Sequence, residues 1–217
     1  LGREATLNRL NEALRSNSED PVAYYFRGQI FSQMELYGQA LEDFNRSVAL
    51  GFGGPRLFAA RGRLAPLMGH DPAALSDLNT AIRGDPENPE YYAYLGEFYR
   101  SRTSYSSAAL NLGKALRLDP ESAVAHHILG LLHYDLGLHQ RAIQDFDSAI
   151  SLDPGLAEAL NSRTEAYQQR DLLAEKGLAT QVFEDLSRSY SLEFSQPEFF
   201  FWRGQMFQLM GRIEAAL

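Results

Sequence analysis

The chain has 217 residues, 45% of them hydrophobic and 22% charged, with a formal net charge of −8 at pH 7. It contains no cysteine, which excludes a disulfide framework, a thiolate nucleophile, an iron–sulfur cluster and a Cys-ligated zinc site. Its 28 acidic residues outnumber 20 basic ones, which argues against a nucleic-acid partner, because phosphate neutralisation needs a clustered basic surface. No stretch approaches the roughly 18–20 apolar residues of a membrane span, so we expect no membrane insertion.

Small residues recur along the chain with a period of 34 residues. The glycines of this pattern are Gly28, Gly62, Gly96 and Gly130, and the alanines are Ala40, Ala74, Ala108 and Ala142. A bulky residue follows each alanine by four positions, at Phe44, Leu78, Leu112 and Phe146. Small residues let two helix backbones approach closely, and bulky residues fill the space beside them at helical spacing. Each period therefore predicts a pair of antiparallel helices.

In chain order, residues 1–20 are predicted to form the second helix of a truncated repeat. Regular repeats follow at 21–54, 55–88, 89–122 and 123–156. A fifth repeat at 157–196 carries six extra residues near Gln168–Gly177, and 197–217 is a second truncated repeat. We expect the insertion to be a tolerated surface loop, with a partner-contacting elaboration as the alternative. Because both ends cut through a repeat, we expect a fragment of a longer protein.

Proline positions predict where several helices begin and end. Asp20-Pro21, Asp71-Pro72 and Asn88-Pro89 each place a capping side chain before a proline, whose missing N–H is no loss at the first helical position. Pro66 falls inside the first helix of the second repeat, where it removes a hydrogen bond to Gly62. That helix is predicted to kink or finish early.

The residues that recur every 34 positions resemble the pattern of a known protein family. The 34-residue helix–turn–helix, with its small residues at Gly28 and Ala40 and its Asp-Pro pairs at Asp85, Asp119 and Asp153, resembles the tetratricopeptide repeat over essentially the whole chain. The resemblance implies an all-α fold: a right-handed superhelical solenoid of antiparallel helix pairs, forming one domain over 1–217. It implies a cytoplasmic, non-catalytic module with no cofactor that binds a protein or peptide partner, and leaves an oligomer open.

Enzyme chemistry has little support in the sequence, which has no phosphate-binding glycine loop and neither a GxSxG nor an HExxH motif. Histidines gather at His126, His127, His133 and His139. His126 and His133 fall in columns that hold Tyr92 and Tyr99 in the third repeat, so we interpret them as core substitutes held by a neighbouring hydrogen bond. We predict no metal site; a metal or pH-sensing role is the alternative.

Arginine and aspartate also recur in register. Arginine precedes the glycine column at Arg27, Arg61, Arg163 and Arg203, and aspartate precedes the bulky column at Asp43, Asp77, Asp145 and Asp185. The spacing predicts Arg–Asp contacts repeated along the stack. The sequence leaves open whether each pair forms within one repeat or between neighbouring repeats, because the third repeat has Leu95 and Asn111 at these positions and the fourth has Leu129 in the arginine column.

By the resemblance, the first helix of each repeat lines a concave face that binds a partner's peptide or helix. The positions expected to point into this groove are Tyr25, Gln29, Gln33, Arg56, Arg63, Tyr94, Glu97, Arg100, His127, Leu131, Tyr134, Asn161, Glu165, Phe201 and Gln205. Phe26, Leu67 and Trp202 also qualify. Aromatic rings suit binding hot spots, yet Tyr24, Tyr92, Phe200, Phe26 and Trp202 fit an interhelical core as well.

Family members that clamp an acidic C-terminal tail use Lys, Asn and Arg at defined groove positions. Here those positions hold Tyr25, Gln29, Ala60 and Tyr94, so we expect no carboxylate-clamp chaperone tail as partner and favour an apolar or mixed peptide. Two other functions stay open. The solenoid could be a structural scaffold or spacer that uses its convex face and ends, or the regulatory arm of an enzyme that lies outside this sequence.

Overall fold

A computed structural model describes residues 2–68 and 71–168, and the regular elements among these residues are all helical. The predicted all-α class is therefore confirmed. The chain divides into two compact units, Leu1–Ser104 and Tyr105–Leu217, which we call the N-terminal and C-terminal units. The insertion near Gln168–Gly177, the second helix of the fifth repeat and the truncated repeat at 197–217 lie outside the described residues.

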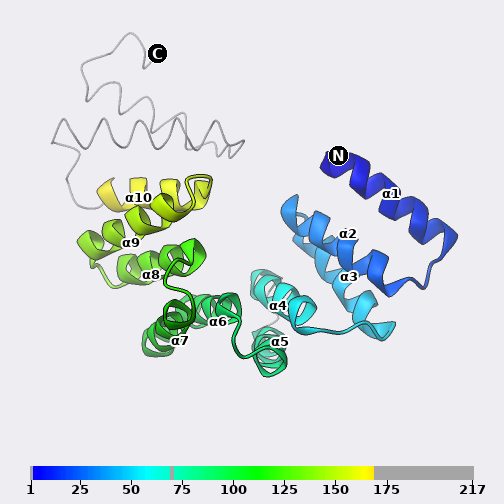
Figure 1. Cartoon of the computed structure of the whole chain (residues 1–217), viewed down its shortest axis with the longest axis horizontal. Helices are drawn as coiled ribbons and strands as arrows, with labels where there is room; N and C mark the ends of the chain where they lie inside the picture. The colour runs from blue at the N-terminus through cyan, green and yellow to red at the C-terminus, as the bar shows by residue number, and fades with distance from the viewer. Residues whose placement is uncertain (1, 69–70, 169–217) are drawn as a thin grey trace, which may run out of the picture. The chain divides into compact units, whose positions relative to one another are not determined.

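The described residues of the N-terminal unit form six α-helices and one short 3₁₀ helix. They are α1 (Arg3–Ser16), α2 (Pro21–Gln33), α3 (Tyr37–Ala49), α4 (Pro55–Leu64), the 3₁₀ helix η1 (Ala65–Met68), α5 (Asp71–Gly84) and α6 (Pro89–Ser101). Helices α2 and α3 lie side by side as one hairpin, and α4 and α5 as the next (Figure 1). α1 packs on α2, and α6 packs on α5.

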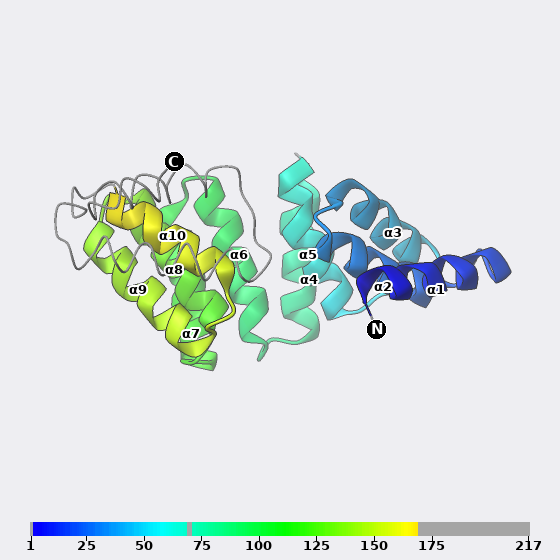
Figure 2. The ribbon, with the colours of Figure 1, turned by 90° about the horizontal axis from the view of Figure 1, so that it is seen from above.

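The described part of the C-terminal unit contains α7 (Tyr105–Leu118), α8 (Ala123–Asp135), α9 (His139–Leu152) and α10 (Ala157–Gln168). Helices α8 and α9 form a hairpin, with α7 packed on α8 and α10 packed on α9 (Figure 2). The first helices α2, α4, α6, α8 and α10 begin at residues 21, 55, 89, 123 and 157, so the period of 34 residues is kept from one helix start to the next.

Helix ends follow the local chemistry that the sequence predicted. The carboxylate of Asp20 accepts hydrogen bonds from the backbone N–H groups of Val22 and Ala23, and the Asn88 amide oxygen accepts one from Glu90. α5 begins at Asp71 itself, one residue earlier than predicted. α4 ends at Leu64, just before Pro66, and continues only as the 3₁₀ helix. The early end of this helix is thus confirmed.

The glycine column is where paired helices touch. A Cβ atom placed on Gly28 would lie 2.7 Å from the Phe44 ring and 3.2 Å from the Ala40 carbonyl oxygen. One on Gly130 would lie 2.5 Å from the ring of Phe146. Phe44 and Phe146 are fully buried, as are Ala40 and its counterparts in the other repeats. The close approach of the two helices therefore requires glycine at these crossings.

In the N-terminal unit the predicted Arg–Asp pairs form within one repeat, and the same arginines reach the preceding repeat through an asparagine. Nε and Nη2 of Arg27 donate to the Asp43 carboxylate at 2.7 Å within one repeat, while Nη1 donates to Asn11 of the preceding helix at 2.9 Å. Arg61 makes the same three bonds, to Asp77 at 2.6 and 2.8 Å and to Asn45 at 3.1 Å. The same guanidinium thus closes its own hairpin and ties it to the previous one.

Candidate functional site

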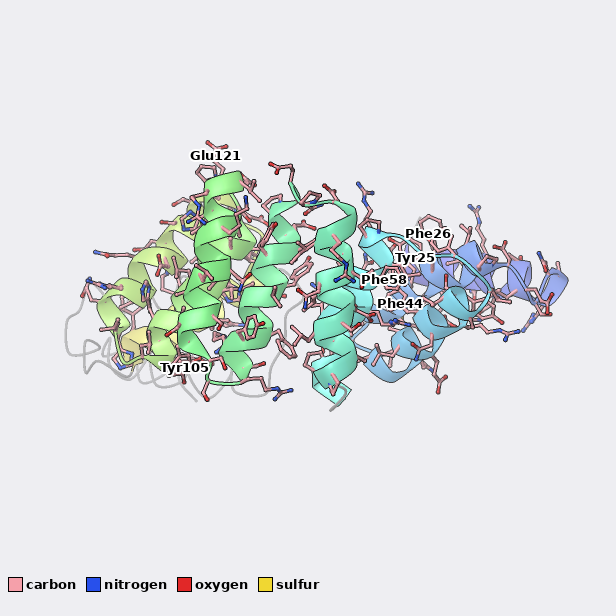
Figure 3. All side chains as sticks on the ribbon, turned by 90° about the horizontal axis from the view of Figure 1, so that it is seen from below. Tyr25, Phe26, Phe44, Phe58, Tyr105 and Glu121 are labelled. Atoms are coloured by element: carbon pink, nitrogen blue, oxygen red, sulfur yellow. The ribbon has the colours of Figure 1, made fainter. Side chains whose placement is uncertain are left out.

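Eight of the predicted groove residues lie on α2, α4 and α6. We call the side of these helices that carries them the first-helix surface of the N-terminal unit. On α2, Tyr25 is only 8% exposed, and its ring lies 5.2 Å from that of Phe26, which is 49% exposed. The Tyr25 ring also lies 6.2 Å from that of Phe44, and Figure 3 labels Tyr25, Phe26 and Phe44 in the N-terminal unit. Gln29 donates to the Tyr25 hydroxyl oxygen at 2.8 Å. Tyr25 therefore belongs largely to the core, and Phe26 is the exposed aromatic residue of this helix.

A hollow of about 450 Å³ opens where α2, the α3–α4 loop and the start of α6 meet; we call it the Tyr91 pocket. Its lining residues are Tyr25, Phe52, Gly54, Pro55, Arg56, Leu57, Gly84, Asp85 and Tyr91. Arg56 is exposed at its edge. Burial raises the pKa of Tyr25, against the opposing charge of Arg56. The pocket therefore combines aromatic walls with a nearby positive charge.

A smaller hollow of about 130 Å³, the Tyr94 pocket, lies between the C-terminal halves of α4 and α6. It is lined by Gly62, Arg63, Pro66, Tyr94, Glu97, Phe98, Ser101 and Arg102. The Arg63 guanidinium sits 5.3 Å from the centre of the Tyr94 ring, and Arg100 pairs with Glu97 through two bonds of 2.9 Å. Burial raises the pKa of Tyr94, although Arg63 acts in the other direction. Four predicted groove residues are thus brought together here.

A third hollow, of about 450 Å³, is lined mainly by residues of the second helices α3 and α5. We call it the Arg61 pocket, and its lining residues are Gly38, Leu41, Glu42, Asn45, Arg61, Ala65, Ala73 and Asp77. None of these residues was predicted as a groove position. Its polar lining includes Asn45 and Asp77, which both already accept hydrogen bonds from Arg61.

In the C-terminal unit, the predicted groove residue His127 of α8 contacts Ser162 of α10, which was not a predicted groove residue. Nε2 of His127 lies 3.1 Å from Oγ of Ser162, whose hydroxyl donates to the Glu158 carbonyl, so His127 is the donor in this bond. Leu131, Tyr134 and Asn161 are half-buried, and Glu165 is exposed. Gln33, on α2, is also exposed. Phe201 and Gln205, together with Trp202, lie outside the described residues.

His126 and His133 of α8 are each held by a neighbouring hydrogen bond, as the sequence predicted, although both are half-buried and not part of the core. His126 Nε2 donates to the Pro120 carbonyl at 3.0 Å, as the Tyr92 hydroxyl does to Pro86 at 3.1 Å one repeat earlier. His133 Nδ1 lies 2.5 Å from Oδ2 of Asp145. Within residues 2–68 and 71–168, no three His, Asp or Glu side chains are grouped to hold a metal ion.

Sequence reasoning missed Tyr91, Phe52 and Asp85, which line the Tyr91 pocket, and Phe98 and Arg102, which line the Tyr94 pocket. Tyr91 did leave a signal. The third position of each described repeat holds Ala23, Leu57, Tyr91, Ala125 and Ala159, so a tyrosine interrupts a column of apolar residues. Phe52 and Asp85 leave no such signal, because they lie between helices, where the repeat imposes no spacing.

The fold and the hollowed first-helix surface define a helical-repeat protein of the α-solenoid class. Residues 21–50 and 99–157 match two family models, each described as tetratricopeptide repeat. These two segments are therefore tetratricopeptide repeats, which are typically modules for protein–protein interaction. No curated protein sequence matches the chain. None of the described helices is long and apolar enough to cross a membrane.

Solved structures share the fold at low sequence identity. The APC/C hetero-tetramer Cut9-Hcn1 superposes with a TM-score of 0.76 at 14% identity, covering 99% of this chain and 43% of that one. A monomeric IFIT1 mutant with m7Gppp-AAAA gives 0.75 at 16%, covering 99% and 52%. A tetratricopeptide repeat protein from Parabacteroides merdae gives 0.61 at 20%, covering 97% and 81%. The chain thus spans about half, or less, of the first two relatives.

Proposed function

We propose that the chain is a non-catalytic binding module, and that its repeats form one solenoid whose first-helix surface holds a peptide or helix of a partner protein. The observation that carries this proposal is the pair of hollows beside α4. The Tyr91 pocket lies at the start of α4 and the Tyr94 pocket at its end, and both reach α6. A bound segment that follows α4 can therefore place one side chain in each hollow.

The chemistry of this surface suits a segment with both apolar and acidic residues. Phe26, on α2, supplies an exposed ring, and aromatic rings are common anchors in protein interfaces. Arg56 and Arg63 are exposed on α4, one beside each hollow. Arginine combines a positive charge with a planar group that stacks on rings, as Arg63 does on Tyr94. The surface therefore offers both apolar area and charge recognition.

The test selects peptides from a random 16-residue phage library against the full chain and measures one selected synthetic peptide by fluorescence anisotropy. We expect Arg63→Gln to weaken binding about fivefold or more, because central arginines in interfaces typically contribute more than about 1 kcal/mol. Arg46→Gln is the matched control, since Arg46 is exposed on the second helix α3. Equal binding by both variants, or no selected peptide at all, would overturn the proposal.

The Arg61 pocket favours a second candidate, a scaffold that contacts its partner through the second helices. Glu42 lies in the lining of that pocket and is exposed. In the same anisotropy assay, a scaffold of this kind loses affinity with Glu42→Gln and keeps it with Arg63→Gln. The first-helix proposal expects the reverse pattern.

A further inference from the structure

Tyr91 has an unusual buried hydroxyl group. It occupies the third position of its repeat, where Ala23, Leu57, Ala125 and Ala159 place only carbon atoms in the core. The side chain is only 2% exposed, and its hydroxyl has no hydrogen-bond partner. A buried polar atom without a partner destabilises the fold, because it has lost its bonds to water. A ligand oxygen in the adjoining pocket would supply the missing bond.

The groups that act electrostatically on this hydroxyl include three that line the Tyr91 pocket. Burial is the largest cause that raises the pKa of Tyr91, followed by the charge of Asp85; Arg56 acts against both, and Glu90 and Tyr25 raise it further. Tyr91 therefore keeps its proton at neutral pH. A protonated phenol can donate a hydrogen bond to a ligand in this pocket.

Two further donors belong to the same pocket. Because Gln29 donates to the oxygen of Tyr25, the hydroxyl hydrogen of Tyr25 is left to donate elsewhere. Arg56 is exposed and lines the same pocket. The remaining walls include Phe52 and Leu57, which are apolar. The pocket thus combines three donor groups, one of them positively charged, with an apolar wall.

We propose that the Tyr91 pocket receives a carboxylate on an apolar stem, namely the side chain of a glutamate from the partner protein. The stem packs against Phe52 and Leu57, and the carboxylate accepts hydrogen bonds from Arg56 and the two tyrosine hydroxyls. Charge-assisted bonds of arginine to carboxylate are among the stronger ones in proteins. This proposal rests on the proposed function, since it assigns one side chain of the bound segment.

Asp85 limits the charge that the pocket accepts. Its carboxylate lies in the same lining as Arg56, so it opposes a second negative charge. A phosphate carries about −1.5 to −2 at pH 7, whereas a carboxylate carries a single charge. The pocket therefore favours a carboxylate over a phosphate group. It also differs from the tail clamp considered above, because it uses neither Lys nor Asn.

The test uses three compounds that share a phenylpropyl group: 4-phenylbutyrate, 4-phenylbutanamide and 4-phenylbutylamine. Each is titrated into the ¹⁵N-labelled full chain while the backbone amide signals of Arg56, Leu57 and Tyr91 are followed by NMR. We expect the acid to bind about fivefold or more tighter than the amide, because a hydrogen bond to a charged group is stronger than one between neutral groups. Tightest binding by the amine, or by none of the three, would overturn the proposal.

Variants separate the pocket from the general charge of the chain. Arg56→Gln should bring the affinity for the acid down to that for the amide, whereas Arg9→Gln, which removes an exposed arginine of α1, should leave it unchanged. Asp85→Asn should strengthen acid binding. Equal losses with both arginine variants would show an effect of net charge alone and overturn the assignment.

Tyr91→Phe keeps the ring and removes only the hydroxyl. We expect weaker binding of the acid, by about threefold or more, together with a more stable ligand-free fold, since the unpartnered atom is gone. An unchanged affinity would remove Tyr91 from the proposed site. Failure of phenylbutyrate with retained binding of the selected peptide overturns the pocket proposal alone. The reverse result overturns the proposed function and leaves a small-molecule carboxylate site.

Discussion

Replacing Gly130 by alanine tests whether the glycine column exists to let helices touch. The added Cβ would lie 2.5 Å from Cε1 and 2.6 Å from Cδ1 of Phe146, whose ring is fully buried and has little room to move. Overpacking of this kind costs about 1–3 kcal/mol. The higher helix propensity of alanine offsets about 0.8–1.0 kcal/mol of this loss. We therefore expect the free energy of unfolding to fall by about 1 kcal/mol.

Gly113 provides a matched control within the same unit. It also lies inside a helix, α7, but a Cβ atom there would meet only Nη1 of Arg117, at an ordinary 3.5 Å. Gly113→Ala should therefore raise the free energy of unfolding by about 0.8–1.0 kcal/mol. Urea unfolding of the full chain, followed by far-UV circular dichroism, measures both changes.

The result that refutes the reasoning is a shift of the same sign for both variants, because both would then report helix propensity alone. A double variant identifies the contact. If the Phe146 ring causes the loss, Phe146→Leu in the Gly130→Ala background should show a favourable coupling of about 0.5 kcal/mol or more, as expected for residues in contact. Additive effects would place the strain elsewhere.

The other predictions use the same unfolding assay. Arg61→Gln should lower stability by about 3 kcal/mol, since Asp77 is only 5% exposed and loses its charged partner. Asp20→Ala should cost about 1 kcal/mol by removing the helix cap. Burial raises the pKa of Asp145 above 3.8 despite the contact with His133, so the folded state binds this proton more tightly than the unfolded state, and stability falls as pH rises through that range. Asp145→Asn should therefore gain stability relative to the unchanged chain as the pH rises above about 4.

The parts of the fold that depend on spacing were predictable from the sequence. Gly28 and Gly130 could be placed at helix crossings because one residue decides each crossing, and Pro66 ended its helix for a local reason. The direction in which a side chain points was harder to predict from the sequence. Tyr25 and Phe26 are consecutive residues of α2 and were both predicted to point into the groove. The packing of Phe44 and Phe52 against Tyr25 is consistent with Tyr25 being buried and Phe26 exposed.

The Tyr91 pocket lay beyond prediction for a related reason. It joins residues from α2, α4 and α6 with residues of the chain between helices, such as Phe52 and Asp85. A repeat pattern fixes positions within each hairpin, yet it carries no information on how the connecting residues close over the gap. Tyr91 was visible as an exception in its column, but its role depends on these neighbours.

The arginine column forms the predicted Arg–Asp pairs within a repeat and adds a bond to an asparagine of the preceding repeat, which the sequence did not predict. A guanidinium has five N–H donors in a planar fork, so Arg27 can hold both oxygens of Asp43 and still reach Asn11 with its remaining nitrogen. A lysine at this position would offer a compact charge with no fixed fork. Where the fourth repeat has leucine instead, Asp145 turns to His133 of the same hairpin. One residue type thus sets the register both within a hairpin and between neighbouring hairpins, which is the role expected of a partly buried ion pair.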